Sequence, residues 1–149
     1  MLFRSRPNRA ASGFASSIIR EPLSGREAIC PVGPEIVMAL ISPRRVAAAL
    51  LHALDLPEAA LGAPRSLQLP AFSASVGDMA EAVRRAGGKA AYARIRWARD
   101  AMIEAIVAGW PRQLAAARAA ALGFEADAGI DEAVAAFIED DLAAQQALG

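Results

Sequence analysis

The spacing of apolar and polar positions divides the chain into helices and short strands. Apolar residues recur with a helical period in six segments, which predicts helices over residues 10–20, 43–54, 75–88, 100–108, 111–122 and 130–144. Short apolar or alternating runs predict strands at 28–32, 36–41, 67–69 and 93–97. No internal repeat or linker divides the sequence, so this order predicts one α-rich domain of the α/β class.

Two of these helices have clear start signals. Ser42 followed by Pro43 predicts an N-cap and first helical residue, because serine accepts a hydrogen bond from the first turn and proline needs none there. Ser75 and Asp78 have the spacing of a capping box, with Asp in place of the usual Glu or Gln. These positions fix the expected starts of the second and third helices.

Further local patterns predict where helices end and which face they bury. The Glu21-Pro22 step should end the first helix, because the residue before proline avoids the α region. The Gly87-Gly88 pair should end the third helix. Glu81 and Arg85 have the spacing of an ion pair along that helix. The second helix should bury one apolar stripe, formed by Val46, Leu50, Ala53 and Leu54.

Composition limits the classes of protein that fit. The 149 residues carry 16 basic and 16 acidic side chains, which argues against binding to nucleic acid or a membrane surface through net charge. No apolar run is long enough to span a bilayer. The single cysteine, Cys30, excludes an intramolecular disulfide and favours a reducing, cytoplasmic location.

Few side chains are candidates for catalysis or metal binding. His52 lies near Asp55 within a predicted helix, where a surface or partly packed histidine is the favoured interpretation. Cys30 should be a buried, inert thiol, and the acidic run 139–141 a solvated helix face. One His and one Cys argue against a His/Cys zinc site, and no glycine-rich nucleotide motif occurs. From the residues alone, the chain is an α/β domain of undetermined role.

The segment ARAAALGFEADAGIDEAVAAFIED, residues 117–140, resembles the C-terminal signature of the extended short-chain dehydrogenases. This family includes the NAD-dependent epimerases and dehydratases. In it, one helix closes on Leu-Gly-Phe, a short extended turn follows, and a last helix packs back. Gly123 can adopt the left-handed conformation that closes a helix, Phe124 can then enter the core, and Gly129 replaces the more usual Ser or Thr N-cap.

Other segments extend the resemblance over residues 7–140 and favour a subfamily that acts on a four-carbon sugar acid. They are PNRAASGFASSIIREPLSGREAICPV, SPRRVAAALLHA, LPAFSASVGDMAEAVRR, ARIRW and IEAIVAGWP. The family also has a Rossmann half with a glycine-rich NAD turn, a catalytic Ser and a Tyr-x-x-x-Lys pair. Here the single tyrosine, Tyr92, and the single lysine, Lys89, are in the wrong order for that pair.

The resemblance therefore implies that residues 1–149 form a single substrate-binding lobe without the NAD-binding half. Such a lobe should be inactive alone and should expose an apolar surface for the missing Rossmann half or a homo-oligomer partner. Two alternatives stay open. One is the equivalent lobe of a nucleotide-sugar epimerase or dehydratase, and the other is a non-catalytic helical interaction domain.

Position by position, the resemblance places Asn8, Ser12 and Phe14 near the reacting centre. Asn8 and Ser12 could donate hydrogen bonds to substrate oxygens, although both could instead cap the first helix. Arg44 could bind a substrate carboxylate, whereas Arg45 should face solvent. The unusually apolar positions in the run GPEIVMAL leave the exact substrate open; they are Ile36, Val37 and Ala39. Basic residues of the 93–97 strand are weak evidence for a nucleic-acid contact.

Overall fold

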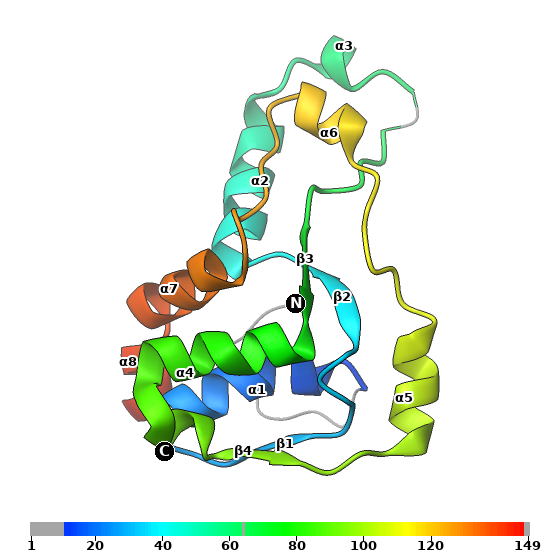
Figure 1. Ribbon diagram of the computed structural model, residues 1–149. Coiled ribbons are helices and arrows are strands. Elements are labelled where there is room, and N and C mark those ends of the chain that lie inside the picture. Colours follow the sequence, from blue (N-terminus) through cyan, green and yellow to red (C-terminus); the bar gives the residue numbers. More distant parts are fainter. Residues whose placement is uncertain (1–10, 64, 148–149) are drawn as a thin grey trace.

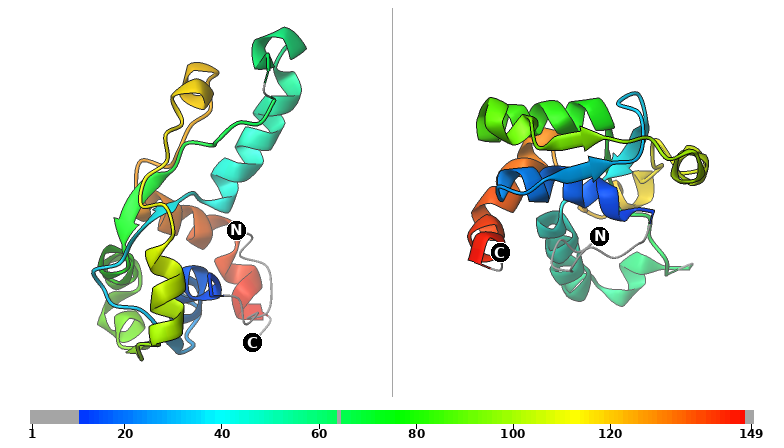
Figure 2. Two further views of the ribbon diagram at one scale, coloured as in Figure 1. Left: turned by 90° about the vertical axis from the view of Figure 1, so that its right-hand side faces the viewer. Right: turned by 90° about the horizontal axis from the view of Figure 1, so that it is seen from below.

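The computed structural model describes residues 11–63 and 65–147, which form a body and a projecting arm (Figures 1 and 2). The helices of the body are α1 (Gly13–Leu23), α4 (Val76–Tyr92), α5 (Ala101–Ala108), α7 (Ile130–Asp140) and α8 (Leu142–Ala147). The helices of the arm are α2 (Pro43–Asp55), α3 (Glu58–Leu61) and α6 (Ala117–Ala121). The fold is helix-rich with a few short strands, as the sequence predicts.

The strands form two separate two-stranded sheets. They are β1 (Ala28–Cys30), β2 (Val37–Leu40), β3 (Phe72–Ser75) and β4 (Ile95–Trp97). β1 pairs with β4 in parallel, with Cys30 opposite Trp97, and β2 pairs with β3 antiparallel, with Leu40 opposite Phe72. The strands predicted at 28–32, 36–41 and 93–97 are therefore present, each somewhat shorter than predicted.

The main core lies where α4 stacks on α1, with the β1–β4 pair below them in Figure 1. Both helices have one apolar face, and burying these faces against each other supplies the driving force for packing. The most enclosed apolar side chains are Ile18, Val32, Val76, Met79 and Val83. A smaller cluster of Ala49, Ala119 and Phe124 joins α2 to α6 in the arm.

The predicted helix starts are confirmed. Ser42 precedes α2, and its hydroxyl accepts a hydrogen bond from Arg45 N at 3.2 Å. Ser75 and Asp78 form the capping box of α4: Asp78 N donates to Ser75 Oγ at 3.0 Å, and Ser75 N donates to Asp78 Oδ2 at 2.9 Å. The side chain of Asp100 caps α5 in the same way. Each cap satisfies backbone donors that the helix itself leaves unpaired.

The predicted end of α1 at the Glu21-Pro22 step is wrong. The helix runs through Pro22 to Leu23, and Pro22 is fully buried in its last turn. Burial against the core outweighs the local preference of the residue before proline. Beyond the proline, Ser24 caps the end, because its N and Oγ both donate to Arg20 O. Ala10, the predicted first residue, lies outside the described residues.

One predicted helix forms only in part, and one predicted strand does not form. The helix predicted over 111–122 is reduced to α6, because the chain after Trp110 pairs instead with β2 through the bond from Ala39 N to Pro111 O, 3.2 Å. The strand predicted at 67–69 is an extended segment in which Leu67 and Leu69 pack on the arm cluster. No described strand lies beside it to complete a ladder, and β3 begins only at Phe72.

The predicted buried stripe of α2 is only partly confirmed: Ala53 packs against the arm cluster and Val46 is half-buried, but the two leucines are exposed. Leu50 is 65% exposed and Leu54 is 82% exposed, while Ala49 is the buried residue of this helix. Leu50 and Leu54 continue the helical spacing of the buried face, but they lie at its solvent side in the arm. Leu51, on the same surface, is 66% exposed.

Details of α4 and α7 differ from the predictions. Gly88 breaks the regular helix with φ 74°, as predicted, but a further helical turn continues to Tyr92. The predicted Glu81–Arg85 pair is wrong: Glu81 pairs with Arg84 at 2.6 Å, and Arg85 reaches across to Asp131 of α7 at 2.6 Å. The last predicted helix is divided in two, since α7 ends at residue 140 and α8 begins at 142.

Candidate functional site

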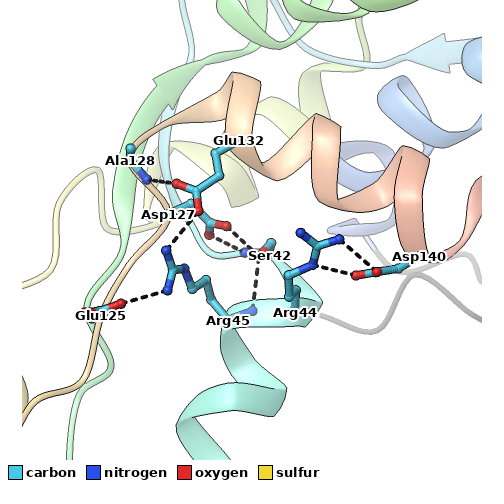
Figure 3. Close-up of polar contacts among 8 residues, drawn as sticks. All are labelled: Ser42, Arg44, Arg45, Glu125, Asp127, Ala128, Glu132 and Asp140. Atoms are coloured by element: carbon cyan, nitrogen blue, oxygen red, sulfur yellow. Dashed lines mark hydrogen bonds and ion pairs between the residues drawn. The ribbon is translucent and has the colours of Figure 1, made fainter.

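The first turn of α2 is the centre of a network of polar side chains (Figure 3). Ser42 N donates to Asp127 Oδ2 at 2.8 Å, and Ser42 Oγ donates to Asp127 Oδ1 at 2.6 Å. Ser42 is 1% exposed and Asp127 is 4% exposed, so both groups depend on each other for hydrogen bonds. This pair joins the start of the arm to the segment that leads into α7.

Arg44, the residue expected to bind a substrate carboxylate, is held by two carboxylates of α7. Its Nε and Nη2 donate to the two oxygens of Asp140 at 2.8 Å each, and Nη2 also donates to Glu139 at 2.7 Å. The guanidinium hydrogen bonds lower the pKa of Asp140, and those two carboxylates raise the pKa of Arg44. Residues 139 and 140 are therefore ion-pair partners rather than a merely solvated face.

The sequence predicted that Arg45 faces solvent, but its side chain is held by two ion pairs. Its Nη1 donates to Glu125 at 2.8 Å and its Nη2 to Glu132 at 2.9 Å. The bond from Ala128 N, followed by that from Arg45, lowers the pKa of Glu132. The partners lie 80 and 87 positions away along the sequence, which is why local patterns could not reveal them.

His52 has a packing role, in agreement with the favoured interpretation. Its Nε2 lies 2.7 Å from Leu122 O, and its ring meets the edge of Phe124 with centroids 4.9 Å apart. Gly123 has φ 87°, as the Leu-Gly-Phe pattern predicts, and Phe124 is buried. A Cβ at residue 123 would lie 3.2 Å from His52 Nε2, so this closure joins α2 to α6 tightly.

The other predicted site residues occupy different environments. Asn8 lies outside the described residues. Ser12 is the N-cap residue of α1, but its side chain makes no capping hydrogen bond. Phe14 is 6% exposed and belongs to the main core. No hydrogen bond or ion pair joins any two of Ser12, Phe14 and Arg44 in the described part of the chain.

The described residues offer no arrangement for metal-dependent or thiol chemistry. Within 11–63 and 65–147, no group of three His, Cys, Asp or Glu side chains could hold a metal ion. Cys30 is fully buried, and burial raises the pKa of its thiol, which donates weakly to Val32 O. A buried neutral thiol is unreactive, as the sequence predicted.

The described residues do not fit a dinucleotide. A pyrophosphate cradle needs open backbone N–H groups at a glycine-rich turn between a strand and a helix. The described strand-to-helix turn of this kind, at β3–α4, is closed by its own Ser75–Asp78 capping box. A Cβ at Gly77 would meet Pro34 O at 3.2 Å, so the chain itself fills this space.

A groove of about 480 Å³ lies on the body, where α4, β4 and the loop after β1 meet. We call it the α4–β4 groove. Its lining includes Asp78, Glu81, Tyr92, Trp97 and Arg99. The sequence did not indicate this site, because these residues are separated along the chain. Trp97, the last residue of β4, is 37% exposed.

Among the curated relatives of this chain, two are named D-erythronate dehydrogenase. The relative from Cupriavidus necator is 49% identical over 135 residues, which is 91% of this chain and 42% of the relative. The relative from Haemophilus influenzae is 41% identical over 137 residues, which is 92% of this chain and 44% of the relative. No family model matches the chain.

Solved structures also match this chain over only part of their own length. The structure described as the nucleoside-diphosphate-sugar epimerase from Agrobacterium tumefaciens is 40% identical, with a TM-score of 0.90 over 96% of this chain and 42% of that chain. In sequence and in fold the chain matches part of these relatives, in agreement with the predicted resemblance to the extended short-chain dehydrogenases. A GalE-like L-threonine dehydrogenase from Cupriavidus necator, 20% identical with a TM-score of 0.76 over 93% of this chain and 44% of that chain, shares this fold.

The chain spans less than half the length of the curated relatives that it matches. The two groups of relatives also carry different names, one for a sugar-acid dehydrogenase and one for a nucleotide-sugar epimerase. Among the described helices, none has the length and apolar character to cross a membrane.

Proposed function

We propose that residues 1–149 form a single lobe that binds the substrate of an NAD-dependent dehydrogenase acting on a sugar acid. The reaction is oxidation of a secondary alcohol by hydride transfer to NAD. The observation that carries this proposal is the 49% identity to a D-erythronate dehydrogenase over 91% of the chain. We further place the protein in the cytoplasm, because its single cysteine is a buried thiol.

Arg44 is the proposed anchor for the substrate carboxylate. Its bonds to Glu139 and Asp140 use Nε and Nη2, and they leave the two N–H donors of Nη1 without a partner among the described residues. A ligand carboxylate can approach Nη1 while α7 holds the guanidinium in place. In this proposal, Asn8 and Ser12 supply further hydrogen bonds to hydroxyl oxygens of the substrate. Phe14 packs in the main core and thereby positions α1.

NAD binding and proton transfer belong, in this proposal, to the portion of the relatives that the chain does not match. The described residues lack a dinucleotide cradle, so the lobe alone should not reduce NAD. The exposed leucines of α2 supply an apolar surface of the kind expected for contact with that portion or with a second copy of the lobe. They are Leu50, Leu51 and Leu54.

The second candidate is a nucleotide-sugar epimerase lobe. The 40% identity and TM-score of 0.90 to a structure described as a nucleoside-diphosphate-sugar epimerase favour it. This candidate requires recognition of a diphosphate, which needs several cationic donors at once. Arg44 and Arg45 are each already paired with two carboxylates, so they do not offer the several free cationic donors that a diphosphate requires.

A chimera separates the two candidates. The chain replaces the matching portion of the Cupriavidus necator relative, and NAD reduction is measured with D-erythronate and with a panel of nucleotide sugars. The proposal predicts NAD reduction with D-erythronate by the chimera and none by the chain alone. Turnover only of nucleotide sugars would transfer the assignment to the epimerase candidate.

A further inference from the structure

The α4–β4 groove lies apart from the polar network of α2, and the proposed function gives it no role. Its volume of about 480 Å³ lies within the range of small-molecule sites, which are concave and combine apolar walls with a few polar groups. Its ligand class can be argued from the side chains that line it.

Two aromatic side chains form its apolar walls. Tyr92 is the last residue of α4 and Trp97 is the last residue of β4. Neither the Tyr92 hydroxyl nor the Trp97 indole N–H makes a hydrogen bond to another described residue. The faces of such rings attract cations because of their negative electrostatic potential.

The acidic side chains of the groove each keep one oxygen without a described partner. Asp78 accepts hydrogen bonds from Ser75 N and Oγ through Oδ2 alone, at 2.9 and 2.7 Å, which leaves Oδ1 available. These bonds lower the pKa of Asp78, so it is ionised at neutral pH. Glu81 accepts from Arg84 Nε through Oε2 at 2.6 Å, which leaves Oε1 available.

The single arginine of the lining does not make the groove a site for anions. Arg99 Nε donates to Glu104 at 2.6 Å, and Arg99 Nη2 donates to Glu35 at 2.7 Å. In addition to these two partners, Asp78 and Glu81 line the groove itself. The four carboxylates face two guanidinium groups, those of Arg99 and of Arg84, which pairs with Glu81, so the field of the groove favours a positive ligand.

We infer that the α4–β4 groove binds a small organic ammonium ion. The charged nitrogen lies at the available oxygens of Asp78 and Glu81 and next to the faces of Tyr92 and Trp97, against which the apolar part of the ligand packs. An ammonium group has N–H donors for those carboxylate oxygens, and its charge is attracted by the aromatic faces. A neutral analogue of the same shape lacks the charge that strengthens both interactions, and an anionic analogue is repelled by the carboxylates.

The probes are phenethylammonium, its neutral analogue 2-phenylethanol and its anionic analogue phenylacetate. Each is titrated into the full chain while the indole N–H signals of both tryptophans are followed by NMR. Phenethylammonium should bind saturably and shift the Trp97 signal. Trp110 does not line the groove and serves as an internal control, whose signal should stay in place. Neither analogue should bind with comparable affinity.

Three variants test the named contacts. Trp97→Leu should weaken phenethylammonium binding about fivefold, a value within the range of a lost cation–π contact. Glu81→Gln and Asp78→Asn should each weaken it by a similar factor, and Asn at 78 can still cap α4. Glu58→Gln on the arm is the matched control and should leave binding unchanged. The inference is overturned by equal binding of the three probes, by absence of saturable phenethylammonium binding, or by unchanged affinity in the three groove variants.

Discussion

Ser42 and Asp127, 85 positions apart in sequence, form a buried pair in which one carboxylate accepts both the backbone N–H and the hydroxyl of one serine. The same hydroxyl caps α2. The pair therefore fixes where the arm leaves the body, and it positions Arg44 and Arg45 opposite their acidic partners in α7 and the turn before it.

Removing this hydroxyl should destabilise the chain. Ser42→Ala deletes the α2 cap and leaves one oxygen of a buried carboxylate without a donor, so the free energy of unfolding should fall by about 2–4 kcal/mol. Urea denaturation followed by circular dichroism measures the change. Ser73→Ala is the control, because Ser73 is exposed and its hydroxyl bonds only to Arg112 O. An equal loss of unfolding free energy in the two variants would show that the buried pair stabilises the chain no more than an exposed hydrogen bond does.

Stability should fall on the acid side of neutrality. Hydrogen bonds lower the pKa of Asp78, Glu132 and Asp140 in the folded chain. A lowered folded-state pKa stabilises the fold above the ordinary pKa, here 3.8 for Asp and 4.5 for Glu, and that contribution is lost as pH falls through the lower folded-state value. Chemical denaturation at a series of pH values should thus show constant stability near neutrality and a decline below these values.

A variant tests the origin of that decline. Asp78→Asn cannot titrate, so its stability should decline less between neutral and acidic pH than that of the native chain. Glu58→Gln serves as control, because Glu58 lies exposed on the arm. A native-like decline in Asp78→Asn would exclude Asp78 as a contributor.

Gly123 should be less tolerant of a side chain than Gly25. Both have a left-handed φ, 87° and 88°, so alanine at either position should cost about 1–2 kcal/mol through backbone strain. A Cβ at 123 also meets His52 at 3.2 Å, whereas a Cβ at 25 meets nothing within 4 Å. Gly123→Ala should therefore lower the midpoint of thermal unfolding more than Gly25→Ala does. Equal decreases in the two variants would show that the contact with His52 does not affect stability.

The exposed leucines of α2 should contribute little to the stability of the chain alone. Leu50→Ser with Leu54→Ser should change the free energy of unfolding by no more than about 0.5 kcal/mol each, because both side chains lie in solvent. The double variant should also bind less hydrophobic dye and self-associate less in size-exclusion chromatography. Ala49→Asp, on the buried face, is the contrasting variant and should unfold the arm. A large loss from the leucine variants would show that this face is packed.

Local sequence patterns predicted most elements of the fold but few of its long-range contacts. Ser42, Ser75 and Gly123 were assigned correctly because caps and left-handed closures depend on neighbouring residues. The failures at Pro22 and Leu54 have the opposite cause. Tertiary burial keeps Pro22 helical, and Leu54 stays exposed because α2 packs through its Ala49 face instead.

The candidate site was harder to predict for the same reason. The resemblance pointed to Arg44, but its acidic partners lie 95 and 96 positions away and carry no local signal. Asp127 and the α4–β4 groove were not predicted, because no local sequence motif marks either of them. Each arises only when segments far apart in sequence meet.

The measurement that tests the central claim most directly is NAD reduction by the chimera with D-erythronate, with and without Arg44→Met. We predict that the chimera is active and that Arg44→Met raises KM about tenfold, the effect of losing a charged hydrogen bond worth about 1.4 kcal/mol. Arg45→Met, one residue further along α2, should leave KM within about twofold. Arg45 pairs with Glu125 and Glu132 and has no contact with the substrate in this proposal. A folded chimera that binds NAD but does not oxidise D-erythronate would contradict the assignment of this lobe.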